Sequence, residues 1–599
     1  MAFGFTMAAP AAGSPRAAGP DGRRSALAGA LAACRSGLVG IALFSGLSNL
    51  LMLTGSIFML EVYDRVLPSR SVPTLVGLAL LAALLYGFQG VLDLLRSRLF
   101  LRIGQALDEA VGQRVFAGIV RLPLKARGGG DGLQPLRDLD QLRGFLSAGG
   151  PSALFDLPWI PLYLGLCFLF HFWIGMTALA GALLLIGIAL ATEIAIRAPS
   201  RAVAGHALAR SGWAAAGRRN SEVLQAMGMA ERLGALWGEA NRDYLAAHRR
   251  ASDIGTGLGT LSRVLRLILQ SAVLGVGAWL VIHQEATGGV IIASSILVSR
   301  ALAPVELSIA GWKGFVAARQ GWQRLDRLLE LFPFPAAPTA LPRPAASLSV
   351  EGLSVSPPGE TRAVVQEVAF ALQAGQALGV IGPTASGKSS LARALVGVWP
   401  ALRGKVRLDG AALEQWSPER LGPALGYLPQ DVELFDGSVA DNIARFQPDA
   451  DPAAIVAAAR AAGVHELILR LPEGYDSRIG EGGTALSAGH RQRIGLARAL
   501  YGDPFLVVLD EPNSNLDSDG EEALGRAIAA VRARGGIAVV IAHRPSALGA
   551  VDQLLVMGEG RAQAWGPRDE VLAKVLRRPG AAPLKVVAEG PVQAQGGVR

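Results

Sequence analysis

The chain is poor in cysteine and in charged residues, and each shortage excludes a class of protein. It has 2 cysteines among 599 residues, and Cys34 and Cys167 lie far apart, in or beside apolar stretches. A disulfide framework or a cysteine-ligated metal site needs more cysteines at close spacing, so we expect neither. Charged residues make up 18% of the chain, below the roughly 25% of soluble domains. This shortage indicates that part of the chain lies in a membrane.

Two further features are missing. No basic face interleaved with aromatic residues accompanies the net charge of +9, so we do not expect nucleic acid as a partner. Residues 1–30 are rich in Ala, Gly and Pro and lack the apolar region and cleavage site of a secretory signal. We expect them to form a disordered cytoplasmic tail.

What the chain does have is a series of apolar stretches, each close to the roughly 20 residues that cross a bilayer. They lie at 37–59, 73–95, 155–172, 174–194, 262–283 and 288–311. We therefore expect an all-α transmembrane domain of six helices over residues 31–331, surrounded by lipid.

The distribution of arginine predicts the orientation of these helices. Segments 96–150 and 197–250 are rich in Arg, whereas the connections near 61–71, 171–173 and 283–285 are short and nearly free of it. Because basic segments stay inside, both termini are predicted to be cytoplasmic. Periodic apolar residues in the two long segments predict helices that continue beyond the bilayer.

The sixth stretch contains Arg300, Pro304 and Glu306. A charge at the centre of a membrane helix costs at least about 2.5 kcal/mol unless it faces a cavity or a partner. One interpretation is that Arg300 and Glu306 line a cavity; the other is that the helix enters the cytoplasm and the two charges snorkel or pair. Asp93 and Arg96 are interpreted as a local ion pair of residues i and i+3.

The second half of the chain has a different pattern. Residues 332–346 form a linker rich in Pro and Ala, and residues 577–599 form a similar tail. In residues 347–576, β-rich runs alternate with helical ones, which predicts an α/β domain with a mostly parallel sheet.

A glycine loop lies between an apolar run and a helix-like segment in this domain. Its residues are Gly382, Pro383, Thr384, Ala385, Ser386, Gly387, Lys388 and Ser389, followed by Ser390. The pattern G-x-x-x-x-G-K-[ST] between a strand and a helix predicts a phosphate cradle, in which Lys388 reaches the β/γ-oxygens of ATP and Ser389 binds Mg²⁺. The alternative is a glycine-rich turn without a ligand.

An apolar run at 505–509 ends in two acids, Asp510 and Glu511. Acids at the carboxyl end of a buried parallel strand lie where α/β sheets bind ligands. Asp510 would hold Mg²⁺, and Glu511 would act as the base that polarises the attacking water. The alternative is that the pair only caps a helix.

With these two motifs and the segment between them, the chain resembles the ATP-binding cassette (ABC) family over residues 347–575. The segment is the family's signature, here Leu486, Ser487, Ala488, Gly489 and His490. The resemblance implies an α/β P-loop ATPase domain whose Ser487 and Gly489 contact the ATP bound to a second subunit. It therefore implies a dimer with two ATP molecules between the subunits.

The resemblance assigns roles to four further residues. Gln430 matches the glutamine that contacts Mg²⁺ and water, and Asp517 matches the aspartate of the D-loop. His543 matches the switch histidine that contacts the γ-phosphate. Glu481 matches a residue that couples the ATPase to the membrane domain, although an exposed loop carboxylate is the alternative.

Two departures from the family pattern stand out. Ala488 and His490 replace a glycine and a glutamine of the usual signature, and we expect activity to survive because Ser487 and Gly489 remain. No aromatic residue occurs in 347–369 to stack on adenine, a contact that normally contributes about 1–3 kcal/mol. We therefore expect the missing contact to affect both the selectivity for the base and the affinity for the nucleotide.

Six spans before one cassette resemble an exporter half-transporter, which implies a homodimer. Segments 62–69 (VYDRVLPS), 155–159 (FDLPW) and 300–306 (RALAPVE) look like those of type I secretion permease/ATPases of the alkaline-protease (PrtD) type. That resemblance implies an inner-membrane exporter of unfolded proteins, with a periplasmic adaptor and an outer-membrane duct as partners. A lipid or small-molecule exporter is the alternative, whereas the six spans oppose a soluble cassette ATPase.

Overall fold

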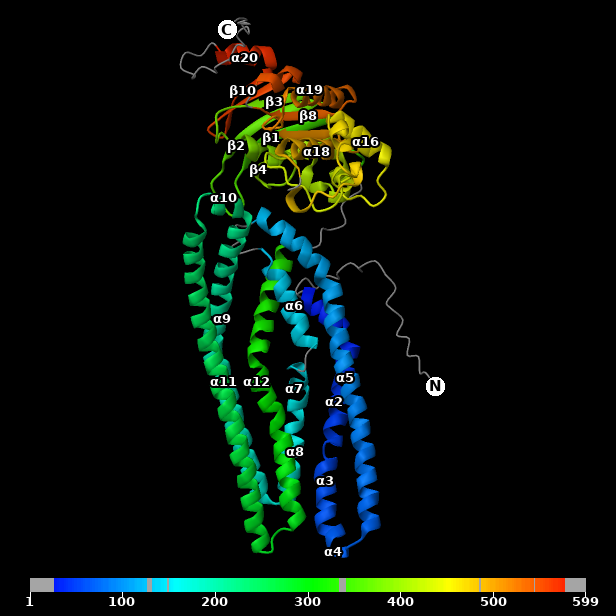
Figure 1. The fold of residues 1–599 in the computed structure, drawn as a ribbon, viewed down its shortest axis with the longest axis vertical. Helices are drawn as coiled ribbons and strands as arrows, with labels where there is room; N and C mark the ends of the chain where they lie inside the picture. The colour runs from blue at the N-terminus through cyan, green and yellow to red at the C-terminus, as the bar shows by residue number, and fades with distance from the viewer. Residues whose placement is uncertain are drawn as a thin grey trace, which may run out of the picture. The chain divides into compact units, whose positions relative to one another are not determined.

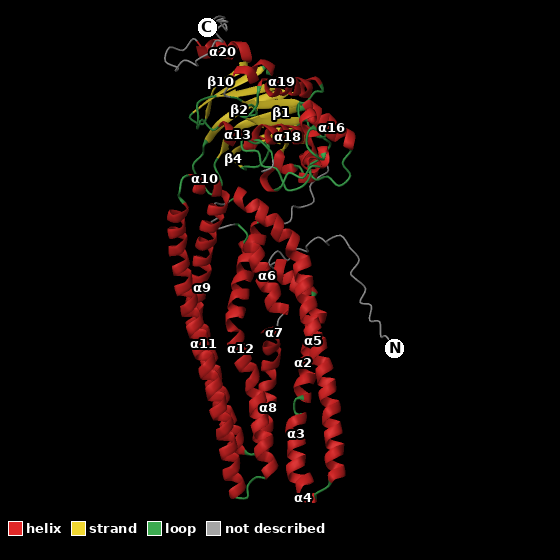
Figure 2. Ribbon diagram, viewed as in Figure 1, coloured by secondary structure: helices red, strands yellow, loops and turns green. Residues whose placement is uncertain are grey.

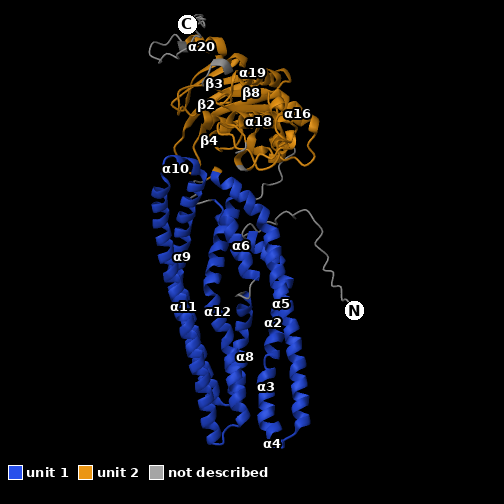
Figure 3. Ribbon diagram, in the orientation of Figure 1, with its two compact units in different colours: residues 1–123, 128–334 blue, residues 124–127, 335–599 orange. Residues whose placement is uncertain are grey.

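The computed structural model describes residues 26–125, 132–147, 150–332, 341–483, 486–542 and 545–576. The chain divides into two compact units, residues 1–123 with 128–334 and residues 124–127 with 335–599 (Figure 3).

The described residues of the first unit form helices joined by short turns (Figure 1). The helices are α1 (Ala26–Ala33), α2 (Arg35–Leu51), α3 (Thr54–Glu61), a π-helix (Val62–Val66), α4 (Leu67–Ser69), α5 (Val72–Arg121), α6 (Gln134–Ser147), α7 (Gly150–Asp156), α8 (Ile160–Phe170), α9 (Phe172–Arg219), α10 (Ser221–Ala226), α11 (Ala230–Ile282) and α12 (Gly288–Leu331).

The prediction of six membrane spans is confirmed. The six helical stretches that are long and apolar enough to cross a membrane are Arg35–Ser69, Val72–Leu124, Pro151–Phe170, Phe172–Arg219, Ala230–Ile282 and Gly288–Leu331. Helices α5, α9, α11 and α12 have 50, 48, 53 and 44 residues. At 1.5 Å per residue each is more than twice as long as the roughly 30 Å hydrocarbon core, so they continue beyond it, as predicted for the two long arginine-rich segments.

The first and third spans are interrupted. In the first, α2 ends at Leu51, α3 begins at Thr54, and the π-helix Val62–Val66 follows. In the third, a 3₁₀ turn at Leu157–Trp159 separates α7 from α8. Pro158 lies in that turn, and it has no N–H to donate and disfavours a helical residue before it.

Three connections on one side of the spans are very short. Only Arg70 and Ser71 separate α4 from α5, and only His171 separates α8 from α9. Residues 283–287 connect α11 to α12. Asp64 from the π-helix stabilises this last connection, because its carboxylate accepts hydrogen bonds from Thr287 Oγ1 at 2.6 Å and from the Gly289 N–H at 2.9 Å.

Helix α12 is the most enclosed of the spans: half of its apolar window is buried, compared with 11% for α5. It contacts α3, α6, α8, α9 and α11, and α9 and α11 run side by side for much of their length (Figure 1). Its residues belong to two apolar clusters, one with α8, α9 and α11 and one with α1, α5 and α6. Helix α12 is therefore the central packing element of the unit.

A buried polar cluster lies within the spans. Asp156 accepts hydrogen bonds from Asn49 Nδ2 at 2.8 Å and from Arg96 Nη1 at 3.1 Å, and the Tyr163 hydroxyl donates to the Asn49 backbone carbonyl at 2.8 Å. The predicted pair of Arg96 and Asp93 is present at 3.4 Å. This ion pair extends a polar cluster whose members lie on α2, α5, α7 and α8.

The second unit contains the strands (yellow in Figure 2). They are β1 (Ser347–Val355), β2 (Val365–Gln373), β3 (Ala377–Ile381), β4 (Ala401–Leu408), β5 (Ala411–Ala412), β6 (Leu425–Leu428), β7 (Leu506–Asp510), β8 (Ile537–Ile541), β9 (Gln553–Gly558) and β10 (Arg561–Pro567). The helices are α13 (Lys388–Leu395), α14 (Pro418–Leu421), α15 (Val439–Ile443), α16 (Pro452–Ala461), α17 (His465–Leu469), α18 (Ala488–Leu500), α19 (Ser518–Ala533) and α20 (Arg568–Leu576).

These strands form two sheets. The first has the order β10-β9-β3-β8-β7-β6 and is parallel except for β10, and the second is antiparallel with the order β2-β1-β4-β5. Every residue of β7 and β8 is buried, as expected for continuous apolar runs in a parallel sheet covered on both faces. The carboxyl ends of β3, β6 and β7 meet at one edge of the sheet, and the predicted site residues follow them.

Candidate active site

The glycine loop connects β3 to α13, the arrangement that its sequence predicts. Gly387 caps α13 with a φ of 94°, and a Cβ there would lie 2.8 Å from the Val364 carbonyl oxygen. At Gly382 a Cβ would lie 2.2 Å from the Met557 carbonyl oxygen. Glycine is required at both positions because the backbone turns tightly against neighbouring strands. The loop therefore presents the N-terminus of α13 as a site for phosphate.

Lys388 is buried at the start of α13. Its ammonium group donates hydrogen bonds to the carbonyl oxygens of Gly382 at 3.0 Å and Pro383 at 2.8 Å. Burial lowers the pKa of Lys388, and the charges of Glu511 and Asp510 oppose that shift. The lysine thus lies over the loop and beside the two acids.

Ser389 and Asp510 meet at the metal side of the site. The Ser389 hydroxyl donates to Asp510 Oδ1 at 3.1 Å, and Asp510 Oδ2 is buried without a hydrogen-bond partner among the described residues. Burial raises the pKa of Asp510, although the hydrogen bond from Ser389 acts in the opposite direction. A hydroxyl and an unpaired carboxylate oxygen are suitable oxygen ligands, so these residues fit Mg²⁺.

Glu511 follows at the end of β7, where Gln430 reaches it from the end of β6. Gln430 Nε2 donates to Glu511 Oε2 at 3.1 Å. Glu511 has a φ of 51°, in the left-handed region that side chains other than glycine and asparagine rarely adopt. A strained backbone at a polar site is typical of a functional residue.

The signature residues form the start of α18. The Ser487 side chain caps this helix by accepting a hydrogen bond from the His490 N–H at 3.3 Å. Leu486 is buried, whereas Ser487 and Ala488 are exposed. The polar end of the signature is therefore available for contact with another molecule.

Asp517 caps the following helix, α19. Its carboxylate accepts a hydrogen bond from the Gly520 N–H at 2.9 Å and pairs with Arg493 of α18. The hydrogen bond from Gly520 is the main cause of a lowered pKa at Asp517. Two predicted residues are not tested: His543 lies outside the described residues, and only the backbone of Glu481 is described.

One residue of this region is missing from the set predicted from sequence. Gln492 of α18 is buried, and its side chain contacts the backbone directly after Asp510. The sequence does contain a signal for it. Gln492 lies four residues before Leu496 and eight before Leu500, which are both buried on the same helix, so this spacing predicts that Gln492 is buried too. A glutamine on the apolar face of a helix needs polar partners inside the domain.

The two charged candidates in the sixth span differ in their surroundings. Glu306 forms an ion pair with Arg266, whose Nε lies 2.7 Å from a Glu306 carboxylate oxygen, and it lies 3.9 Å from Arg263; both arginines are on α11. Arg300 is exposed and lies 12 residues after the start of α12 at Gly288. At 1.5 Å per residue this is about 18 Å along the helix from its first residue.

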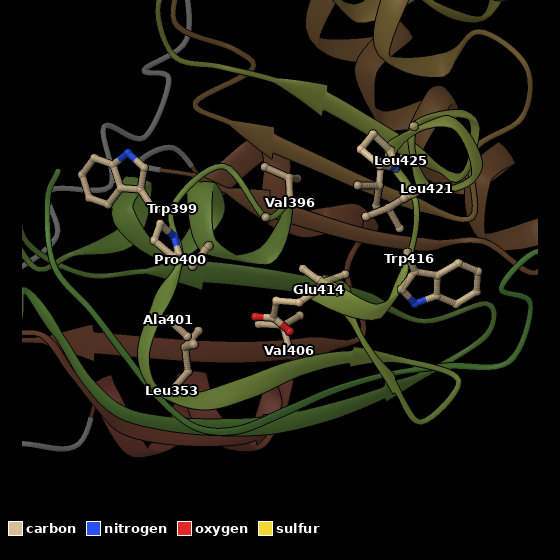
Figure 4. A pocket seen from close by; sticks show the side chains of 15 residues that line it. Leu353, Val396, Trp399, Pro400, Ala401, Val406, Glu414, Trp416, Leu421 and Leu425 are labelled. Atoms are coloured by element: carbon tan, nitrogen blue, oxygen red, sulfur yellow. The ribbon is translucent and has the colours of Figure 1, made fainter. Parts of the chain in front are cut away.

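A separate cavity of about 390 Å³ in the second unit is lined largely by apolar side chains, among them Trp399, Trp416 and Leu421 (Figure 4). It includes no residue of the glycine loop and neither acid. The catalytic region is therefore identified by the loop, β6 and β7, and not by this cavity.

Comparisons with known proteins agree with this geometry. A family profile described as "ABC transporter" matches residues 365–514, and one described as "ABC transporter transmembrane region" matches residues 38–304. The chain is 58% identical, over 95% of its length and 98% of the relative, to "Type I secretion system ATP-binding protein PrsD" of Rhizobium meliloti (strain 1021).

A second relative is "Cyclolysin secretion/processing ATP-binding protein CyaB" of Bordetella pertussis (strain Tohama I), 30% identical over 90% of this chain and 76% of the relative. A solved "bacterial Atm1-family ABC exporter with ATP bound" has a TM-score of 0.77 over 90% of this chain and 97% of that one. Its identity is 23%, so it supports the fold, which is the predicted exporter architecture.

The phosphate loop, the two acids of β7 and the six spans thus agree with relatives that match nearly the whole chain. The domain hydrolyses ATP and couples this reaction to transport. The chain belongs to the ABC transporters and, among them, to the type I secretion ATP-binding proteins that its membrane motifs predicted.

Proposed function

We propose that the chain exports unfolded proteins across the bacterial inner membrane as a homodimer that hydrolyses two molecules of ATP. The observation that carries this proposal is the meeting of Lys388, Ser389 and Asp510 with Glu511 and Gln430 at one edge of a sheet, in a chain that also has six spans. A site of this composition suits phosphoryl transfer to water, which needs charge neutralisation and positioning.

Each residue of the site has a role in this proposal. Lys388 and the loop N–H groups hold the β- and γ-phosphates, and Ser389, Asp510 and Gln430 hold Mg²⁺. The ion neutralises charge on the phosphate oxygens when it is bound. Glu511 accepts the proton of the attacking water, and Gln430 orients the Glu511 carboxylate through its hydrogen bond. His543 contacts the γ-phosphate.

The second copy completes each ATP site. Ser487 and Ala488 are exposed at the start of α18, so the signature of one copy can close over ATP bound to the loop of the other. Asp517, at the start of α19, pairs with Arg493 of the same helix α18. A symmetric pair places identical surfaces against each other and creates both sites at once.

In the membrane domain, we assign Arg300 to the lining of the export path. Its side chain is exposed in one copy and belongs to an apolar membrane span, so its charge needs a polar cavity or the second copy. Glu306 is instead held by Arg266 of α11. The arginine-rich segments support a cytoplasmic position for both termini and for the ATPase domain. We assign Glu481 the role of coupling ATP hydrolysis to the spans.

The names of the relatives support the cargo and the partners. Type I secretion and cyclolysin secretion are named for two of them, so we propose a protein cargo for this chain. A periplasmic adaptor and an outer-membrane duct would continue the path to the medium.

The experiment compares proteins in the culture medium by mass spectrometry for the source strain, a deletion of the gene, and the deletion carrying Glu511→Gln. Loss of the same few proteins from both mutants, restored by the wild-type gene, is the expected result. Immunoblots of the membrane fraction control for the level of the variant. An unchanged set of secreted proteins, with the exporter present, would contradict a protein cargo and favour a lipid or small molecule.

A further inference from the structure

Gln492 makes a dense set of hydrogen bonds inside the ATPase domain. Its Nε2 donates to the Pro512 carbonyl at 2.7 Å and to the Glu511 carbonyl and Ser514 Oγ, both at 3.2 Å. Its Oε1 accepts from the Asn515 N–H at 2.9 Å. The residue is 3% exposed. The buried side-chain amide of Gln492 therefore forms hydrogen bonds with four residues of the connection that follows β7: Glu511, Pro512, Ser514 and Asn515.

This connection determines where the catalytic base points. Glu511 has a φ of 51°, a conformation that persists only when its surroundings enforce it. The Glu511 N–H donates to the Ile541 carbonyl at 3.1 Å, and the Glu511 carbonyl accepts from Gln492 and from the Ser514 N–H at 3.3 Å. Gln492 thus fixes one of the two peptide groups that flank the strained residue.

The same helix begins with the signature. Ser487 caps α18, and a Cβ on Gly489 would lie 3.0 Å from the Asn515 carbonyl oxygen. Asn515 therefore contacts the signature turn through its carbonyl side and Gln492 through its N–H. A shift of α18 cannot leave residues 511–515 in place without breaking these hydrogen bonds.

We propose that Gln492 is a positioning residue that transmits closure of the signature turn to the catalytic base Glu511. The inference rests on the dimer proposed above. In that dimer the signature of one copy contacts ATP on the other, whereas Glu511 acts on ATP bound to its own copy. Gln492 then links the two ATP sites: closure at one site stabilises the active orientation of the base at the other.

The first test compares Gln492→Met with Gln492→Glu in the purified full-length protein. Met removes every hydrogen bond of the side chain at similar size, whereas Glu keeps the bond from Asn515 and loses the donors to Glu511 and Pro512. We expect kcat to fall about tenfold or more in both variants, with the Kd of a fluorescent ATP analogue changed less than about threefold. Near wild-type kcat in either variant would overturn the role of the donors.

Leu496→Ala is the matched control for loss of stability. Leu496 is buried on the same face of α18, four residues further on, and its apolar side chain has no hydrogen bond to offer to residues 511–515. If Leu496→Ala lowers the melting temperature as much as Gln492→Met does and also lowers kcat equally, Gln492 has only a structural role and the proposal is wrong. We expect kcat of the control to stay within about twofold of wild type.

The second test is a double-mutant cycle with Ser487→Ala, which disturbs the signature itself. If Gln492 transmits closure, the double variant loses no more kcat than the worse of the two single variants. If the fold-losses of kcat in the two single variants multiply in the double variant, Gln492 and Ser487 act independently and the proposal is wrong. If Ser487→Ala alone leaves kcat unchanged, the proposed dimer fails. A cargo other than protein would alter neither of the two tests, because both measure ATP hydrolysis.

Discussion

At the scale of single residues, Glu511 is the side chain whose change should separate ATP binding from hydrolysis. Glu511→Gln keeps the shape of the side chain but removes the carboxylate that accepts the proton of water. We expect kcat to fall about 10²- to 10⁴-fold, with ATP still bound. Steady-state hydrolysis and retention of radiolabelled ATP on the purified protein measure the two effects. Retention of most of the rate would show that another group is the base.

Asp510 should make Mg²⁺ binding sensitive to mild acid. Burial raises the pKa of Asp510 above its ordinary range, so this carboxyl takes up a proton at a higher pH than an exposed aspartate does. A proton competes with Mg²⁺, so the affinity for Mg²⁺ should fall as the pH decreases. The Mg²⁺ dependence of hydrolysis, measured from pH 8 to pH 5.5, tests this expectation.

The control for this titration is the affinity of free ATP for Mg²⁺ in the same buffers, because ATP is protonated in the same range. If the Mg²⁺ requirement of the protein follows that of free ATP at every pH, Asp510 is not the group that titrates.

At the scale of elements, the cluster around Asp156 is what joins the interrupted spans. Asp156→Ala leaves Arg96, whose side chain is only 13% exposed, without its closest carboxylate, and it removes the acceptor of Asn49. Breaking one partner of a buried pair costs about 3–5 kcal/mol. We expect a clear fall in the melting temperature of the protein in nanodiscs.

Asp140→Ala is the matched comparison, because Asp140 pairs with Arg143 on an exposed face of α6. Exposed pairs contribute at most about 1 kcal/mol, so this variant should melt close to wild type. Equal melting temperatures for the Asp156 and Asp140 variants would show that the buried cluster does not stabilise the spans.

The elements also show how far sequence reasoning reaches. The span Gly288–Leu331 and strand β7 were predictable because long apolar runs are local signals. The position of Asp156 beside Arg96 and the hydrogen bonds of Gln492 were not, because they join segments 60 and about 20 residues apart. Such contacts depend on the packing of helices, which periodicity does not encode. The phosphate loop was found because its spacing is fixed by the ligand.

At the scale of the whole molecule, the proposed pair of copies predicts complementation between inactive variants. Lys388→Ala damages a phosphate cradle, and Ser487→Ala damages a signature. In a mixed pair both faults fall in the same ATP site, and the other site is intact. We therefore expect co-expressed variants, purified through two different tags, to regain only a fraction of the wild-type rate, but more than either homodimer has. The intact site binds ATP fully, whereas its base receives no closure from the damaged site.

The control is a pair in which both copies, with different tags, carry Lys388→Ala. If the mixed pair is as inactive as this control while ATP still binds to it, each site does not consist of one cradle and the signature of the other copy.

The short connections 70–71, 171 and 283–287 have a consequence for access to the molecule from the side opposite the arginine-rich segments. A protease or an antibody on that side would meet helix ends and tight turns, and no loop of a length that a binding cleft could enclose. A macromolecule that binds the exporter from this side must either contact these turns together as one composite surface or insert between the helices within the bilayer.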